Sequence, residues 1–290
     1  MKKRRISSRT GDSIVEEPKA GSEDISVDSI LFRSLLSEGK KEQALEVSKS
    51  ILERSRVLSD RHFETEAWIR MERALLGACK HEEVGAELSW CVDRLSSTSP
   101  GSALHGLALL NLASWHINSD EVIMALVTLS DISSSRGHPN DVIGLARLES
   151  GRILATIGDL DPAMRHLWMA MKRLSSEEMK TEAMVCAMEW LDLALDKVDT
   201  SSARMEERIS NARPREKPDM TSSPSNPDDI REAVELILSI SLNDLSGDIR
   251  DDLGLVLDAS EIIGDTSWRD SLASRIGEIQ DSRLIDLLQS

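Results

Sequence analysis

The side chains with the most distinctive chemistry in this sequence are three cysteines and six histidines. Cys79 and His81 are separated by one residue and Cys91 follows, a set that superficially resembles part of a metal site. A tetrahedral zinc shell needs a second close pair of ligands, and the sequence offers none. The histidines, at positions 62, 81, 105, 116, 138 and 166, form no i, i+4 pair of the kind that helical zinc motifs use. We therefore predict no metal site and interpret the thiols as side chains buried on helix faces.

Motifs for catalysis are also missing. Asp and Glu number 51, so some close carboxylate pair can always be found, and their abundance alone indicates nothing about catalysis. The sequence contains no nucleophile elbow, Walker loop or dinucleotide-binding fingerprint. We therefore expect a protein that is not an enzyme and that binds no cofactor.

The charge of the chain restricts its partners. The formal net charge is −16, and five of the 35 basic residues lie among the first nine, so 30 basic residues face 51 acidic ones in the rest, a balance of −21. A field of this sign repels nucleic acid and anionic lipid. Nucleic acid is therefore excluded as the expected partner.

Targeting signals are weak. The opening MKKRR is followed by a polar stretch, where a secretory signal needs about 7–15 apolar residues, and no run approaches the roughly 20 apolar residues that cross a bilayer. Three cysteines form no disulfide framework, which is typical of a reducing compartment. We expect a soluble, cytoplasmic protein without a membrane span, beginning with a disordered basic and polar tail at residues 1–25.

The elements that must position any site are helices. From residue 28 onward apolar residues recur at spacings of three and four, as in Trp68, Met71 and Leu75. With six Trp, two Phe and no Tyr, the core must be built mainly from aliphatic side chains and Met, which suits helices. The predicted breaks between helices lie at Gly39, Lys80-His81, Ser99-Pro100, Ser119-Asp120, Gly137-His138-Pro139, Gly158 and Ser175-Ser176.

The predicted helices come in pairs, and the pairs repeat. A small or modest residue early in each second helix aligns Ala44, Val84, Ala125 and Ala163, at separations of 40, 41 and 38 residues. Such a period indicates helix pairs that bury their apolar faces by stacking on their neighbours. We expect an all-α fold, an α-solenoid of antiparallel helix pairs over residues 26–212, with about four to five pairs.

The C-terminal part is set off by composition. Residues 213–227 form a Pro- and Ser-rich linker, and Asn226-Pro227-Asp228-Asp229 then restarts a helix with a cap, a proline and two acids. The helical segment at 228–290 is either a separate small bundle or a set of terminal repeats that fold back on the array. The sequence leaves both open.

Residues 144–175 carry a recognisable repeat pattern. Its matching positions are Gly151 where two helices touch, Gly158 at the turn, and Ala163, Leu167 and Ala170 on the second helix. In these features residues 26–200 resemble tetratricopeptide repeats, with Leu154 in place of an aromatic. The period exceeds the family's 34 residues, and Glu72 stands where a small residue belongs in the second pair, so a HEAT-like or other solenoid is the alternative.

The glycines of this pattern have a steric interpretation. A side chain larger than alanine at Gly151 or Ala163 would push two backbones apart, at a cost of about 1–3 kcal/mol. A phosphate-cradling loop would instead need clustered glycines before a Lys-Ser or Lys-Thr pair. We interpret this stretch as a packing device.

The resemblance also implies a binding surface, because the first helix of each tetratricopeptide pair lines a concave groove. One groove-facing slot carries Arg33, Arg73, Ser114 and Arg152. Flanking slots carry Leu36, Leu76, Ile117 and Ala155 on one side, and Ser29, Ile69, Leu110 and Leu148 on the other. Guanidinium groups pair bidentately with carboxylates. The implied partner is a protein or peptide segment with acidic side chains or a free C-terminus.

Two observations limit this hypothesis. The family's carboxylate clamp uses Lys and Asn, where this sequence has Ser29 and Arg33, so that clamp is not implied. Arginines on helix faces also pair locally, as Arg152 would with Glu149 three residues earlier.

Two functions follow as hypotheses. The first is a non-catalytic scaffold or adaptor that binds a partner segment in the groove. The alternative is a regulatory sensor, in which the repeats bind a ligand or partner and residues 228–290 act as a separate binding or oligomerisation element. The oligomeric state stays open.

Overall fold

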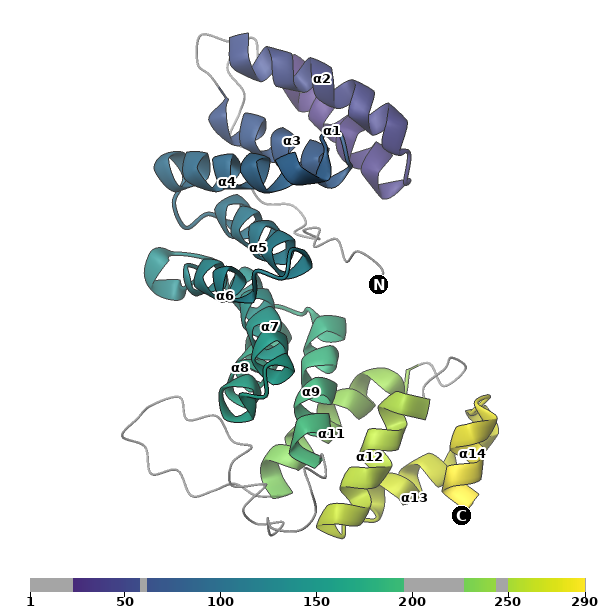
Figure 1. Ribbon diagram of the computed structural model, residues 1–290. Coiled ribbons are helices and arrows are strands. Elements are labelled where there is room, and N and C mark those ends of the chain that lie inside the picture. Colours follow the sequence, from purple (N-terminus) through teal and green to yellow (C-terminus); the bar gives the residue numbers. More distant parts are fainter. Residues whose placement is uncertain (1–22, 58–61, 196–226, 244–249, 290) are drawn as a thin grey trace. The chain divides into compact units, whose positions relative to one another are not determined.

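The computed structural model describes residues 23–57, 62–195, 227–243 and 250–289 (Figure 1). Within these ranges the chain forms helices and no strand, which confirms the all-α prediction. Most of the predicted tail, the end of the predicted array from residue 196, and the linker up to residue 226 lie outside the described residues. None of the described helices has the length and apolar character needed to cross a bilayer.

The chain divides into two compact units, Met1–Val142 and Ile143–Ser290. The first unit contains three helical hairpins in which each helix packs on the next along the chain. The hairpins are α1 (Glu23–Ser37) with α2 (Lys41–Val57), α3 (Phe63–Leu75) with α4 (His81–Thr98), and α5 (Ala103–Asn118) with α6 (Val122–Ser130), followed by the 3₁₀ turn η1 (Ser134–Arg136).

The core of the first unit forms between successive helices. Phe32 of α1 meets Trp68 of α3 edge to face, with ring centroids 5.4 Å apart, above the fully buried Ile51 of α2. A second layer joins α3, α4 and α5 through Met71, Leu88 and other buried side chains. These are the positions at which apolar residues recur every three or four residues, so the sequence pattern places them on the packed faces.

The second unit begins inside α7 (Asn140–Thr156), from Ile143 onward. Its further elements are α8 (Leu160–Ser176), α9 (Lys180–Leu195), α11 (Pro227–Ser241), α12 (Arg250–Ile263), α13 (Ser267–Ser274), the 3₁₀ turn η2 (Ile276–Glu278) and α14 (Ser282–Gln289). Helix α9 packs on α8 and also on α11 and α12, and Trp168 of α8 lies 4.7 Å from Trp190 of α9, centroid to centroid.

This arrangement bears on the alternative that the sequence left open for residues 228–290. Helices α11 to α14 share one buried core with α8 and α9, in which Ile230, Ile237 and Val256 are fully buried. Helices α11 and α12 therefore pack onto α9, and α13 and α14 pack onto α12. Helix α11 begins at Pro227, as the sequence pattern predicted.

Most of the predicted breaks fall between helices, but the separation of α2 from α3 was not predicted, and Ser175-Ser176 form the last residues of α8. Gly39 and Gly158 lie in the turns after α1 and α7 with φ of +73° and +84°, a backbone conformation that glycine adopts without strain. Ala44, Val84, Ala125 and Ala163 are each the fourth residue of the second helix of a hairpin. The three alanines are fully buried and Val84 is half-buried. The predicted equivalence of these four positions is confirmed.

The packing role of Gly151 is confirmed as well. A Cβ atom at Gly151 in α7 would lie 2.8 Å from Leu167 Cγ and 3.2 Å from the carbonyl oxygen of Ala163, both in α8. Even the smallest side chain would therefore force a shift of one helix against the other.

Candidate functional site

The strongest cluster of like-charged donors in the first unit is built on α3. Arg70 and Arg73 lie three residues apart and so project from neighbouring positions on one helix. A neighbouring face of α3 is anchored by Ala67 and Met71, which are fully buried. Cys91 Sγ of α4 donates a hydrogen bond to the Ala67 carbonyl oxygen at 3.3 Å. This packing fixes α3 and with it the direction of both guanidinium groups.

Arg70 is held by α4. Its Nε and Nη2 donate to the two carboxylate oxygens of Glu87 at 2.7 and 2.8 Å, and its guanidinium lies 3.8 Å from the centroid of the Trp90 ring. Burial lowers the pKa of Arg70, but the hydrogen bonds and charge of Glu87 outweigh this and raise it overall. This arrangement is rigid, because the two hydrogen bonds and the contact with the ring face together fix the orientation of the planar guanidinium group.

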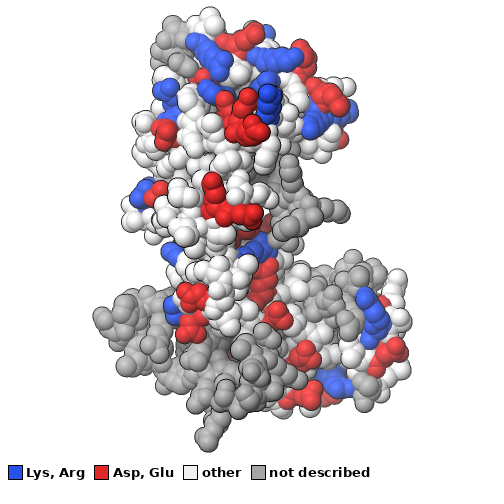
Figure 2. Space-filling model, viewed as in Figure 1, with Lys and Arg blue, Asp and Glu red and all other residues white. Residues whose placement is uncertain are grey.

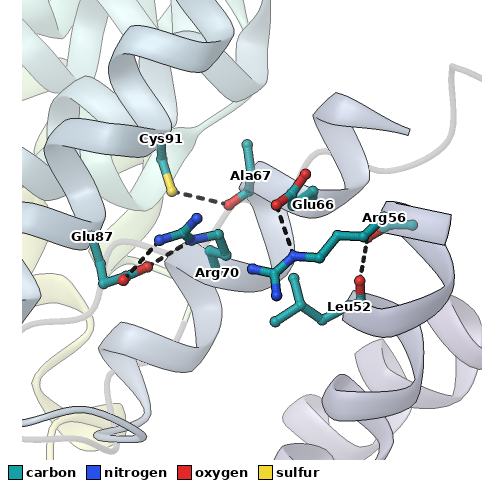
Figure 3. Close-up of polar contacts among 8 residues, drawn as sticks. Leu52, Arg56, Glu66, Ala67, Arg70, Glu87 and Cys91 are labelled. Atoms are coloured by element: carbon teal, nitrogen blue, oxygen red, sulfur yellow. Dashed lines mark hydrogen bonds and ion pairs between the residues drawn. The ribbon is translucent and has the colours of Figure 1, made fainter. Parts of the chain in front are cut away.

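Arg56 of α2 and Arg73 of α3 approach the same place from two helices. Arg56 Nε donates to Glu66 at 2.9 Å, and Glu66 is 1% exposed. Arg73 Nη1 donates to the Leu45 carbonyl oxygen at 3.2 Å and to Ser48 Oγ at 2.6 Å, both in α2. Figure 3 shows the Arg56 side chain extending toward Arg70, whose guanidinium points on in the same direction to Glu87, while Glu66 lies beside the Arg56 guanidinium.

A partly open pocket of about 170 Å³ lies between these side chains. We call it the arginine pocket, and its lining residues are Leu52, Arg56, Arg70, Arg73, Ala74, Ala78, Cys79 and Glu87. Three of the eight lining residues are arginines. The pocket can therefore bind an anion through guanidinium hydrogen bonds, beside a wall of small and apolar side chains.

The cysteines do not gather around a metal ion. Among the described residues no three His, Cys, Asp or Glu side chains are placed to hold one. Cys91 is buried with its pKa raised to about 12 by burial, and burial likewise raises the pKa of Cys186 to about 12. Cys79 is half-buried, and its pKa is raised by burial and by the carboxylates of Glu87 and Glu83. All three side chains are thus thiols at neutral pH.

The predicted groove residues of the first unit divide into buried and accessible ones. Ile69 and Leu110 are 0% and 1% exposed, and Leu76 is also buried, so these side chains belong to the core and form no open floor. Leu36, Ser114 and Ile117 are half-buried. Arg33 is exposed, with its guanidinium 4.9 Å from the Trp68 ring centroid. Arg73 points to α2 and lines the arginine pocket.

In the second unit the predicted groove residues are Leu148 and Arg152 of α7. Leu148 is buried in the core with α8. Arg152 Nη1 donates to Glu149 at 2.7 Å, which confirms the local pairing, and its Nε and Nη2 donate to Glu189 of α9 at 2.9 and 2.6 Å. Two carboxylates thus compensate the charge of Arg152, and its guanidinium joins α7 to α9.

The viewed surface of the first unit carries both signs of charge. Figure 2 shows basic and acidic side chains interleaved there, and several form ion pairs, such as Arg54 with Asp28 at 3.0 Å. Exposed pairs of this kind contribute little to stability. The arginine pocket differs from these paired surface charges, because the arginines that line it outnumber the carboxylates that line it.

A second polar cluster joins helix α5 to the segment before α7 in the first unit. His138 Nε2 lies 3.3 Å from His105 Nδ1, and the stacked rings have centroids 5.2 Å apart. The Gly101 N–H donates to His105 Nδ1 and the Ser133 N–H donates to His138 Nδ1. His105 Nδ1 therefore acts as an acceptor, whereas His138 Nδ1 lies 3.3 Å from both the amide nitrogen and the carbonyl oxygen of Ser133. Burial is the main cause of the lowered pKa of each ring.

Comparison with known proteins adds no family assignment. No protein-family model matches this chain. A search of curated proteins also finds no match. The function must therefore be argued from the residues and geometry above.

Sequence reasoning found Arg73 but missed Arg56 and Arg70 as its neighbours. The spacing of Arg70 and Arg73 on one helix was a visible signal, whereas Glu66, four residues before Arg70, pairs with Arg56 instead. Arg56 carried no such signal, because it reaches the pocket from the preceding hairpin across a segment between α2 and α3.

Proposed function

We propose that this protein is a non-catalytic interaction scaffold: a tetratricopeptide-like solenoid of helix pairs that binds a protein or peptide segment bearing carboxylates on the face of its first helices. The observation that carries the proposal is the repeated hairpin, in which residues 44, 84, 125 and 163 take the same position in four second helices. Repeated hairpins present equivalent side chains side by side, and such surfaces suit extended partners.

The chemistry of the accessible side chains supports a partner with carboxylates. Arg33 is exposed on α1 and stacked on Trp68, and Leu36 is half-buried beside it on the same helix. A guanidinium next to an apolar side chain suits a segment in which acidic and apolar residues alternate. The packing of α11 and α12 on α9 supports an integrated scaffold over a separate C-terminal sensor element.

Selection from a random peptide library displayed with free C-termini tests the proposal. The full-length protein should enrich peptides with Asp, Glu or a required terminal carboxylate, since these pair with guanidinium groups. The variant Arg33→Gln should lose a large part of this enrichment, whereas Arg283→Gln, an exposed arginine of α14 paired with Asp281, should retain it. Enrichment of basic peptides, or no enrichment over a column without protein, would rule the proposal out.

A further inference from the structure

The arginine pocket shares Arg73 with the predicted groove and otherwise extends beyond it. Its residues come from α2 and α4, the second helices of their hairpins, from α3, and from the turn between α3 and α4. The resemblance assigns ligand contacts to first helices only, so a ligand bound to the remaining lining residues would occupy an additional site. Apart from Arg73, none of the lining residues belongs to the predicted groove.

Each of the three arginines has donors left over after its contacts within the chain. Arg56 uses Nε for Glu66, Arg70 uses Nε and Nη2 for Glu87, and Arg73 uses Nη1 for Leu45 and Ser48. Among the described residues, both Nη atoms of Arg56, Nη1 of Arg70, and Nε and Nη2 of Arg73 have no hydrogen-bond partner. Guanidinium groups held by other contacts lose less conformational freedom when they bind a ligand.

The net charge of the side chains at the pocket indicates the charge of the ligand. Three arginines line the pocket, and two carboxylates pair with them: Glu87, which also lines the pocket, and the buried Glu66, which lies outside the lining. Counted together, these groups leave one positive charge. Glu83 is also outside the lining, where its carboxylate accepts the Lys80 N–H at 3.1 Å, and its charge acts on Cys79. A single carboxylate neutralises this excess, whereas a phosphate dianion would exceed it.

The apolar lining residues indicate which kind of chemical group carries the carboxylate. Leu52, Ala74 and Ala78 line the pocket beside the guanidinium groups. Apolar surface of this kind is covered favourably by alkyl groups. We propose that the arginine pocket is a binding site for one carboxylate carried on a short alkyl chain, either a glutamate side chain or the C-terminal residue of a partner segment.

Cys79 provides a reporter inside the pocket. It lines the pocket and is half-buried, whereas Cys91 and Cys186 are buried, so alkylation under native conditions should modify Cys79 selectively. A bound carboxylate would block the thiol and, as a nearby negative charge, would disfavour its thiolate. Both effects slow the reaction with iodoacetamide.

The experiment measures the rate of Cys79 alkylation in the full-length protein by mass spectrometry, at about pH 8 and constant ionic strength. The probes are N-acetylleucine, which carries a terminal carboxylate, and N-acetylglutamate α-amide, which carries a side-chain carboxylate. Each probe is compared with its neutral amide and with inorganic phosphate. Comparison of the two acids identifies which source of carboxylate the pocket prefers.

The inference predicts saturable protection by at least one acid, none by its amide, and weaker protection by phosphate. Arg56→Gln should raise the half-protecting concentration at least about tenfold, because a charged hydrogen bond is lost. Arg54→Gln is the matched control: it removes the same charge from α2, is similarly exposed at 46% against 43%, and lies outside the pocket. Its half-protecting concentration should stay within about twofold of wild type.

Far-UV circular dichroism shows whether Arg56→Gln still folds. If it does not, the same measurement is made with Arg73→Gln, which removes a pocket arginine from a different helix. Equal protection by acids and amides, stronger protection by phosphate, or equal losses in Arg54→Gln and Arg56→Gln would each overturn the inference. The peptide selection described above does not depend on these results, so the two proposals fail separately.

Discussion

Replacing Gly151 by alanine is the most direct perturbation of the helix contact within a hairpin. The added Cβ would lie 2.8 Å from Leu167 Cγ and 3.0 Å from its Cδ2, where carbon atoms normally approach to about 3.5–4.0 Å. Leu167 is 1% exposed and has no open space into which it can turn. The substitution therefore overpacks a closed interface.

The expected magnitude is a difference between two opposing effects. Overpacking in a buried site costs about 1–3 kcal/mol. Alanine in place of glycine inside a helix gains about 0.5–1 kcal/mol. We expect Gly151→Ala to lower the free energy of unfolding by up to about 2.5 kcal/mol.

Gly254 of α12 supplies a matched control, since it is also helical and belongs to the same unit, yet a Cβ there would meet no atom within 4 Å. Gly254→Ala should therefore raise the free energy of unfolding by about 0.5–1 kcal/mol. Urea denaturation of both variants, followed by circular dichroism at the helix band, measures the two changes. The same sign for both would refute the steric account of Gly151.

A double-mutant cycle with Leu167 sharpens this result. Leu167→Ala alone should cost about 2–5 kcal/mol, because it leaves a cavity in the core. In the Gly151→Ala background the cost should be smaller by at least about 0.5 kcal/mol, since the new methyl group fills part of that cavity. Strict additivity would show that the two residues are not in contact.

Three further predictions concern charge and thiol chemistry. Burial, with Arg147 and Arg165 nearby, lowers the pKa of His166 to about 4 from its ordinary 6.5. As pH falls, His166 is therefore protonated in the unfolded chain before it is protonated in the folded chain, and the free energy of unfolding should fall between about pH 6.5 and about pH 4, by up to about 3 kcal/mol. The variant His166→Gln should reduce the pH dependence of the free energy of unfolding in this range. An unchanged pH dependence would contradict the burial of His166. Arg152→Gln should cost about 1–3 kcal/mol in urea denaturation because it leaves Glu149 and Glu189 without their shared donor, and the loss should shrink when Glu189→Gln is combined with it. In the native protein one thiol of three, Cys79, should react readily with a thiol reagent, with all three reacting in denaturant; fast native reaction of Cys91 or Cys186 would contradict their burial.

Local features of the fold could be predicted from the sequence because each depends on neighbouring residues. Gly39 and Gly158 mark turns by their conformational freedom, and the spacing of Ala44, Ala125 and Ala163 reports a repeated packing position. These signals need only the order of residues along one hairpin.

The surface that a helix presents was harder to predict, because it depends on what covers it. Leu110 was expected in a groove, yet α5 is buried continuously from His105 to Ala113 by the helices around it. Arg152 was expected to face a ligand and instead reaches Glu189 on α9, 37 residues away. The amphipathic pattern of α11 showed an apolar face but gave no information on its partner, α9.

The measurement that tests the central claim most directly is an equilibrium titration of the full-length protein with one selected peptide and its neutral twin, in which Asn or Gln replaces each acid and an amide replaces the terminal carboxylate. The account predicts that the acidic peptide binds at least about tenfold more tightly, and that this advantage shrinks as salt is added, because guanidinium–carboxylate pairs supply the difference. Equal affinity of the two peptides at low salt would contradict recognition of carboxylates by this scaffold.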